Sequence, residues 1–210
     1  MNRVLSLIAV IALGTAATDC AQDGPRPARR VGGACDGCEL MYEGMPQELG
    51  WQTSIAGEDE PGEPLEMRGV IYRSDGKTPA PDVILYVYHT DAKGLYSPAP
   101  GQAHGLRHGH LRGWMKTDRQ GRYRFRTIRP APYPNGRIPA HIHPIVKEAG
   151  RNEYGIDEYV FGDDPLVTSK ERGRMEDRGG SGVVDVTRNK EGMWVGHRNI
   201  ILGRNIPHYE

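Results

Sequence analysis

Two histidines separated by one residue, His141 and His143, are the side chains of this sequence best placed to bind a metal ion. In an extended strand, residues i and i+2 point to the same side and lie roughly 6.6 Å apart along the chain, so both imidazoles can reach one ion. The segment 127–144 around them contains five prolines, which disfavour a helix. Tyr133 adds a phenol eight positions before His141. Because a phenolate oxygen is a hard ligand, this donor set suits ferric iron better than zinc.

A second tyrosine and two strand-like segments precede this region. An apolar run at 85–89 leads through a turn to Gly94-x-Tyr96. Residues 117–130 read Thr-Asp-x-x-Gly-x-Tyr-x-Phe-x-Thr-Ile-x-Pro and lead into Tyr-Pro and then Pro-Ala-His-Ile-His, which ends at His143. The order of these motifs, over about residues 65–168, resembles the catalytic core of the intradiol ring-cleavage dioxygenases. Those are non-haem ferric enzymes that open catechols between the two hydroxyls.

The resemblance implies an Fe(III) site with four protein ligands: Tyr96, Tyr133, His141 and His143. A free tyrosine has a pKa of about 10, but a trivalent cation holds the phenol as a phenolate, as metal ions do with bound water and thiols. Two phenolates, two neutral imidazoles and a hydroxide would together neutralise Fe(III). The resemblance also gives Tyr133 a catalytic role, because this tyrosine is expected to leave the metal and accept a proton when a catechol binds.

The activity that the resemblance implies is an oxidoreductase reaction of aromatic catabolism. A small catechol-type substrate and O2 would give a muconate-type diacid. Neither the particular catechol nor the formation of a homo-oligomer can be derived from the sequence. Two other classes stay open: a transthyretin-like extracellular binding module without a metal, and a metal hydrolase built on His141 and His143. The hydrolase would need a third protein ligand and a carboxylate base.

One position departs from the pattern of the family. The intradiol dioxygenases commonly place an arginine three residues before the first ligand histidine, where this chain has Ile138, with Arg137 one position earlier. In a strand, such a slip turns the side chain to the other face, although a bulge near Gly136 and Pro139 could absorb it. Arg137 is therefore our candidate for a catalytic side chain that stabilises charge on the substrate.

Three histidines lie between the two tyrosine ligands in sequence: His104, His108 and His110. The His-Gly-His pair could form a second metal site. Alternatively, these side chains could line the pocket, or they could belong to a polar loop. The sequence does not decide between these interpretations.

The composition predicts an all-β protein. Its 27 basic and 27 acidic residues balance, so nothing points to nucleic acid as a partner. With 28 glycines, 16 prolines and 10 tyrosines, the chain favours short strands and tight turns over long helices. Period-two alternation at 123–127 and an apolar run at 83–89 predict strands. We therefore expect an antiparallel β-sandwich of the prealbumin or immunoglobulin type with long loops.

The N-terminal sequence predicts that the protein is exported, and the whole chain is expected to divide into three segments. Residues 1–21 have a short positive start and an apolar run, which is typical of a signal peptide; lipidation of Cys20 as a lipoprotein anchor is the alternative. Residues 22–64 are expected to form a linker and extension, and 65–210 the catalytic sandwich. The protein would then be periplasmic, secreted or lipid-anchored at the cell envelope. In such a compartment, Cys35 and Cys38 are expected to form a disulfide.

Overall fold

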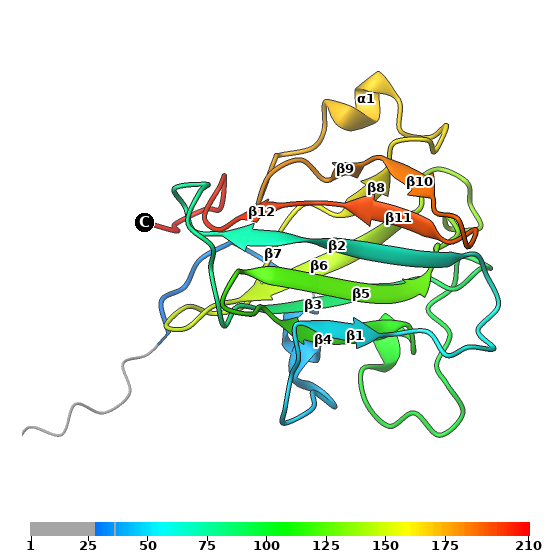
Figure 1. Ribbon diagram of the computed structural model, residues 1–210, viewed down its shortest axis with the longest axis horizontal. Coiled ribbons are helices and arrows are strands. Elements are labelled where there is room, and N and C mark those ends of the chain that lie inside the picture. Colours follow the sequence, from blue (N-terminus) through cyan, green and yellow to red (C-terminus); the bar gives the residue numbers. More distant parts are fainter. Residues whose placement is uncertain (1–27, 36) are drawn as a thin grey trace, which may run out of the picture.

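The structure is a computed structural model that describes residues 28–35 and 37–210. Its fold consists of two β-sheets packed face to face (Figure 1). The first sheet has the order β1 (Gln52–Ser54), β5 (Arg122–Ile128), β2 (Pro64–Tyr72), β11 (Trp194–His197) and β10 (Val186–Arg188), and β12 (Ile200–Ile201) also pairs with β2. The second has the order β4 (Arg112–Lys116), β3 (Ile84–His89), β6 (His141–Lys147), β8 (Tyr159–Phe161) and β9 (Val183–Val184), with β7 (Tyr154–Gly155) beside β6. Within the described residues, the helical turns are η1 (Cys38–Tyr42), η2 (Leu106–His108) and α1 (Ser169–Arg172).

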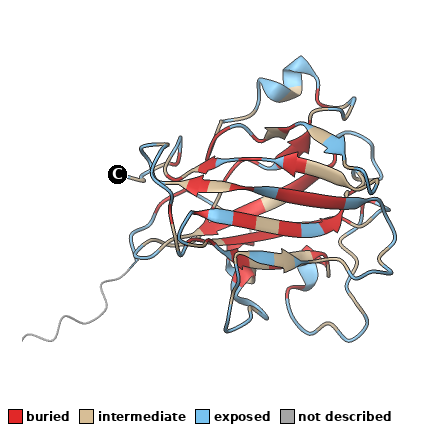
Figure 2. Cartoon of the chain, in the orientation of Figure 1, coloured by how far each residue is buried: buried red, intermediate tan, exposed pale blue. Residues whose placement is uncertain are grey.

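The two strands with the clearest sequence patterns are present as predicted. In β5, Tyr123 and Phe125 are buried while Arg122 and Arg126 are exposed, so the period-two pattern separates a core face from a solvated face (Figure 2). Strand β3 has a run of buried residues because it lies inside the second sheet, between β4 and β6. The all-β prediction is therefore confirmed.

The prediction of a purely antiparallel sandwich is wrong, because both sheets are mixed. Among the strands that the structure describes, four pairings are parallel: β1 with β5, β2 with β11, β2 with β12, and β8 with β9. Parallel neighbours cannot be joined by a tight hairpin and need a long crossover. The chain provides such connections, for example the excursion between β8 and β9 that contains α1 (Figure 1).

The core between the sheets contains both aliphatic and aromatic side chains. Met67 and Phe125 of the first sheet and Leu85 of the second are fully buried. Phe125 packs edge-on against Tyr159, with ring centroids 6.0 Å apart. The Tyr159 hydroxyl donates to the Tyr123 hydroxyl at 3.0 Å, so these buried polar groups are paired. Each large apolar side chain buried here contributes about 1.5–3 kcal/mol, so the packing of the two sheets is strongly favoured.

The segment before β2 packs against the sandwich. Strand β1 pairs with the edge of β5, and η1 follows a disulfide between Cys35 and Cys38, whose Cα atoms are 5.6 Å apart. The predicted disulfide is thus confirmed. The predicted signal segment 1–21, with Cys20, lies outside the described residues. In the part of the chain that is described, no helix is long and apolar enough to cross a membrane.

A buried histidine at the end of β3 predicts a loss of stability in acid. His89 Nδ1 donates to the Thr90 carbonyl at 2.8 Å, and Nε2 lies 2.7 Å from the Thr127 hydroxyl. Burial lowers the pKa of His89 to about 4. Between its ordinary pKa and this value the unfolded chain binds the proton and the folded chain does not, so stability falls as the pH falls. From about pH 7.5 to about pH 5 the loss from this group is about 2 kcal/mol.

Urea denaturation of the wild type and of His89→Gln at these two pH values measures that contribution. Glutamine cannot take up the proton, so the variant should lose less stability on acidification than the wild type does. Equal pH dependence of the two proteins would contradict the assignment of a neutral buried His89.

Candidate metal centre

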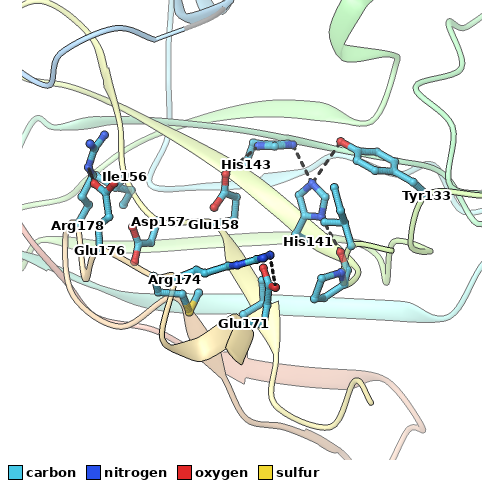
Figure 3. Close-up of a pocket in the computed structure, with 14 residues that line it drawn as sticks. Tyr133, His141, His143, Ile156, Asp157, Glu158, Glu171, Arg174, Glu176 and Arg178 are labelled. Atoms are coloured by element: carbon cyan, nitrogen blue, oxygen red, sulfur yellow. Dashed lines mark hydrogen bonds and ion pairs between the residues drawn. The ribbon is translucent and has the colours of Figure 1, made fainter. Parts of the chain in front are cut away.

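The four predicted ligands come together at one end of the sandwich. The Tyr96 Oη lies 2.8 Å from the Tyr133 Oη and 2.9 Å from the His143 Nε2. The His141 Nε2 lies 3.0 Å from the His143 Nε2 and 3.3 Å from the Tyr133 Oη. Figure 3 shows three of these side chains, Tyr133, His141 and His143, pointing toward one another. Two phenol oxygens and two imidazole nitrogens thus converge on one small volume.

Strand β6 places both histidines. His141 and His143 lie on the same face of the strand, and Ile142 between them is fully buried in the core. The strand is fixed on both sides, because His143 is opposite Tyr88 of β3 and His141 is opposite Val160 of β8. The i, i+2 spacing of His141 and His143 therefore places both imidazoles on one face of a strand, as predicted.

Contacts at the far nitrogens set the tautomers of the two imidazoles. His141 Nδ1 donates to the Pro139 carbonyl at 2.7 Å, which leaves a lone pair on Nε2. His143 Nδ1 faces a carboxylate oxygen of Glu158 at 3.6 Å, which favours a proton on that nitrogen as well. Burial, with the nearby His143, lowers the pKa of His141, so its ring is neutral. Both Nε2 atoms consequently direct lone pairs at one point, and a cation there would satisfy them.

The tyrosines are placed by loops. Asp91 holds the turn before Tyr96: its carboxylate accepts from the Lys93 and Leu95 backbone N–H groups at 2.8 and 3.0 Å and from the Ser97 hydroxyl at 2.6 Å. Burial and the hydrogen bond with Tyr133 raise the pKa of Tyr96 well above its ordinary value. A phenol in this environment ionises only if a cation stabilises the phenolate, so the donor set fits a strongly charged metal ion such as Fe(III).

Gly94 allows the two tyrosine loops to meet. It has a φ of 78°, and a Cβ there would collide with the backbone carbonyl of Pro132, just before Tyr133. The Thr90 hydroxyl donates to the Ala131 carbonyl at 2.7 Å in the same region. The distance between the two phenols therefore depends on a glycine at this position.

Gly94→Ala is expected to reduce Fe(III) binding because the added methyl group pushes the tyrosine loops apart. Gly136→Ala is the matched control: Gly136 also has a positive φ, 64°, but a Cβ there would meet no atom within 4 Å. Both substitutions carry the backbone strain of about 1–2 kcal/mol, whereas only Gly94→Ala adds the collision. Metal content per chain and urea midpoints would be compared. Equal iron content in the two variants would argue against Gly94 as the junction.

A cavity of about 470 Å³ opens onto the cluster. Tyr133, His141 and His143 line one side of it, and Arg174 and Glu171 line another, from the segment that includes α1 (Figure 3). Arg174 and Glu171 form an ion pair with an N–O distance of 3.4 Å. The cavity therefore combines the donor atoms with a charged rim.

Arg137 is not among the residues that line the cavity. Its side chain is exposed, and its backbone N–H donates to the Asn135 side chain at 3.2 Å. The neighbouring Ile138 lines the cavity instead. The arginines that do line the cavity are Arg174 and Arg178, which the sequence pattern did not single out, because their charged, glycine-rich surroundings are typical of an exposed excursion.

The other histidines near the site have separate partners. His110 lies 2.8 Å from a Glu60 carboxylate oxygen and 2.6 Å from the Ser97 carbonyl. His108 is buried, with Nδ1 2.9 Å from the Tyr86 hydroxyl. Over residues 28–35 and 37–210, His, Cys, Asp and Glu side chains form no group of three or more that could hold a metal ion. A metal at the cluster would thus need the phenol oxygens as well as the two imidazoles.

Comparison with known proteins places this geometry in a family. The family model described as "Dioxygenase" matches residues 43–171. The catechol 1,2-dioxygenase of Acinetobacter baylyi is 31% identical over 142 residues, which cover 59% of this chain and 44% of the relative. The chlorocatechol 1,2-dioxygenase of Pseudomonas sp. (strain P51) is 30% identical over 169 residues, covering 70% of this chain and 65% of the relative. The chain spans about half the length of the curated relatives it matches.

Solved structures agree with the assignment. The catechol 1,2-dioxygenase of an Acinetobacter species, inhibited by bound mercury, superposes with a TM-score of 0.57 at 25% identity and covers 77% of this chain and 59% of that one. The dioxygenase domain of a carbohydrate-binding fusion protein from a Streptomyces species shares the fold, with a TM-score of 0.55 at 22% identity over 75% of this chain and 91% of that one. The family model, the sequence relatives and the fold agree: this chain belongs to the intradiol ring-cleavage dioxygenase family.

Proposed function

We propose that this protein is an Fe(III)-dependent dioxygenase that uses O2 to cleave a catechol-type ring between its two hydroxyls. The observation that carries the proposal is the convergence of two phenol oxygens and two imidazole nitrogens, each 2.8–3.3 Å from its neighbours in the cluster. Relatives named catechol and chlorocatechol 1,2-dioxygenase support the choice of substrate class.

In this proposal Tyr96, Tyr133, His141 and His143 hold the iron. When bound, Fe(III) would chelate the catechol and make its ring reactive toward O2. The chain contributes the proton chemistry and the positioning. Tyr133 lines the cavity, so its oxygen, held as a phenolate, can accept a proton from an entering hydroxyl. The Tyr96 Oη, 2.8 Å away, then accepts a hydrogen bond from the neutral phenol.

The rest of the cavity suits an aromatic ring and an anionic product. Ile138 and Val160 provide apolar surface beside the donor atoms. Arg174 and Arg178 line the rim, where each forms an ion pair with a carboxylate, Arg174 with Glu171 at 3.4 Å and Arg178 with Glu176 at 2.5 Å. We assign Ile138 and Val160 to the binding of the ring, and we propose that the two arginines could exchange these partners for a carboxylate of the product.

Oxygen uptake by the purified, iron-loaded protein tests the proposal. The panel would contain catechol, protocatechuate and hydroxyquinol, and the products would be identified by mass. We expect consumption of one O2 per ring, with both oxygen atoms in a ring-opened diacid. A colourless protein that binds zinc through His141 and His143 would instead favour a hydrolase. A protein that binds no metal would favour a binding module.

We also propose that the protein is exported to the periplasm, the cell surface or the medium. The disulfide between Cys35 and Cys38 supports this location, because disulfides seldom persist in the cytosol. Intact-mass analysis of protein from separated cell fractions, with and without alkylation, tests it. We expect an oxidised chain outside the cytoplasm that starts after about residue 16–21. Full-length chain with two free thiols in the cytosolic fraction would contradict export.

A further inference from the structure

A column of stacked rings stands behind one of the metal ligands. The ring of Tyr88 lies on the face of His143, with centroids 4.6 Å apart and planes 15° apart. The other face of the Tyr88 ring stacks on His108, with ring centroids 3.6 Å apart and planes 6° apart. The three rings are therefore nearly parallel, and His108 is the one farthest from the cluster.

His108 is itself held firmly. It is buried, and its Nδ1 lies 2.9 Å from the hydroxyl of Tyr86, a fully buried neighbour. The N-terminal segment covers its other nitrogen: a Cβ on Gly37 would lie 3.0 Å from the His108 Nε2. Gly37 has a φ of 79°, so a glycine is favoured there for conformation as well as for space.

The covering segment is fixed to the second sheet at several points. The disulfide joins Cys35 to Cys38 at one end of this segment. The Trp114 indole N–H of β4 donates to the Met41 carbonyl at 2.6 Å. The Gly105 backbone N–H, just before η2, donates to a Glu43 carboxylate oxygen at 2.6 Å. Cys35, residues 37–43 and the column thus form one packed unit on the outer face of β3 and β4.

The plane of His143 matters because the lone pair on an imidazole nitrogen lies in the ring plane. Rotation of the ring would aim Nε2 away from the Tyr96 oxygen, now 2.9 Å distant. The His141 ring contacts the His143 ring edge-on, with centroids 4.5 Å apart and an angle of 87° between the ring planes. It therefore limits the position of the His143 ring without stacking on it. The parallel contact that sets the plane comes from Tyr88, and Tyr88 is in turn backed by His108.

We propose that His108 is a positioning residue for the metal centre: through Tyr88 it fixes the plane of His143, and residues 37–43, tied at one end by the disulfide between Cys35 and Cys38, hold His108 in place. This inference rests on the proposed function, since it assumes that His143 binds the metal. It also gives residues 37–43 a role in the site, although none of them lines the cavity described above.

Two substitutions at His108 separate ring stacking from simple space filling. His108→Phe keeps a flat ring against Tyr88, whereas His108→Leu fills similar volume without one. Leu202→Ala, at a buried core residue away from the cavity, is the control for general loss of stability. Each full-length protein would be loaded with ferrous ammonium sulfate in air. Urea midpoints, Fe(III) affinity by chelator competition and the visible tyrosinate-to-iron absorption band would then be measured.

We expect His108→Leu to weaken Fe(III) binding about tenfold or more, the effect typical of lost support around a metal ligand, and to shift the visible band. His108→Phe should stay near the wild type in both respects, and Leu202→Ala should lower the urea midpoint without moving the band. Unchanged iron affinity in His108→Leu would overturn the inference. So would an equal loss in His108→Phe, or a similar loss in Leu202→Ala.

A wild-type protein that binds no Fe(III) would instead refute the proposed function. The column is then tested on the metal-free protein by NMR. Stacking on Tyr88 shifts the His143 ring protons upfield, and this shift should be lost in His108→Leu and kept in His108→Phe. The same His143 shift in all variants would refute the positioning role independently of iron.

Discussion

Replacement of His141 by alanine is expected to remove most of the bound iron. The His141 Nε2 lies 3.0 Å from the His143 Nε2 and 3.3 Å from the Tyr133 Oη, so its loss opens the cluster on one side. Its Nδ1 is already fixed by the Pro139 carbonyl, so the lone pair is directed before any metal arrives. Loss of a residue that merely supports a ligand costs about 10–100-fold in metal affinity, and loss of the ligand itself should cost at least as much.

Iron content per chain, measured after gel filtration in the presence of a weak chelator, checks this expectation. His197→Ala is the matched control, because His197 is an exposed histidine on β11 in the other sheet. The control should retain wild-type iron, whereas His141→Ala should retain little. Circular dichroism should show the same β-rich fold in both. Full iron content in His141→Ala would exclude this imidazole as a ligand.

The strands of the sandwich could be predicted where a local pattern reflects burial. The alternation of Tyr123 and Phe125 with arginines placed β5, and the apolar run at 83–89 placed β3. The parallel pairings could not be predicted in this way. The pairing of β1 with β5 joins Gln52 to Arg124, and no local pattern in either strand specifies a partner so distant in sequence. Register between remote strands depends on packing of the whole chain.

The site residues likewise differ in whether a local sequence pattern could place them. The i, i+2 spacing of His141 and His143 is a local property of a strand, so their convergence followed from the sequence alone. The two tyrosines are on loops, and only the resemblance to the family placed them with the histidines. Glu158 and Tyr88 were missed as neighbours of the cluster because each reaches it through tertiary contacts. His108 was one of three histidines that could line the pocket, and only its stacking on Tyr88 places it near the cluster.

The catalytic role of Arg137 stays a prediction. Its side chain is exposed, and the neighbouring Ile138 lines the cavity. Arg174 and Arg178, which line the cavity and are paired with Glu171 and Glu176, lie about forty residues later in the chain. A single sequence contains no signal that the segment with α1 folds back to this cavity, because the contact depends on the long connection between β8 and β9.

Tyr133→Phe is expected to separate metal binding from turnover. The variant should keep iron, because three donors remain: the Tyr96 Oη lies 2.9 Å, and the His141 Nε2 3.0 Å, from the His143 Nε2. Its visible spectrum should change, since one of the two phenolates proposed to bind Fe(III) is gone. Turnover should fall, on the order of 100-fold or more, because a proton acceptor at the cavity wall is removed.

Tyr209→Phe is the appropriate control for this experiment. The Tyr209 hydroxyl donates to Glu148 at 2.9 Å, and Tyr209 does not line the cavity, so its phenol should affect neither colour nor rate. Iron content, visible absorption and oxygen uptake with catechol would be measured on both variants and on the wild type. If Tyr133→Phe kept the wild-type colour and rate, Tyr133 would be neither ligand nor proton acceptor. The 2.8 Å contact between the Tyr96 and Tyr133 hydroxyls would then be only a hydrogen bond between two loops. The proposed iron centre would lose one of its four ligands.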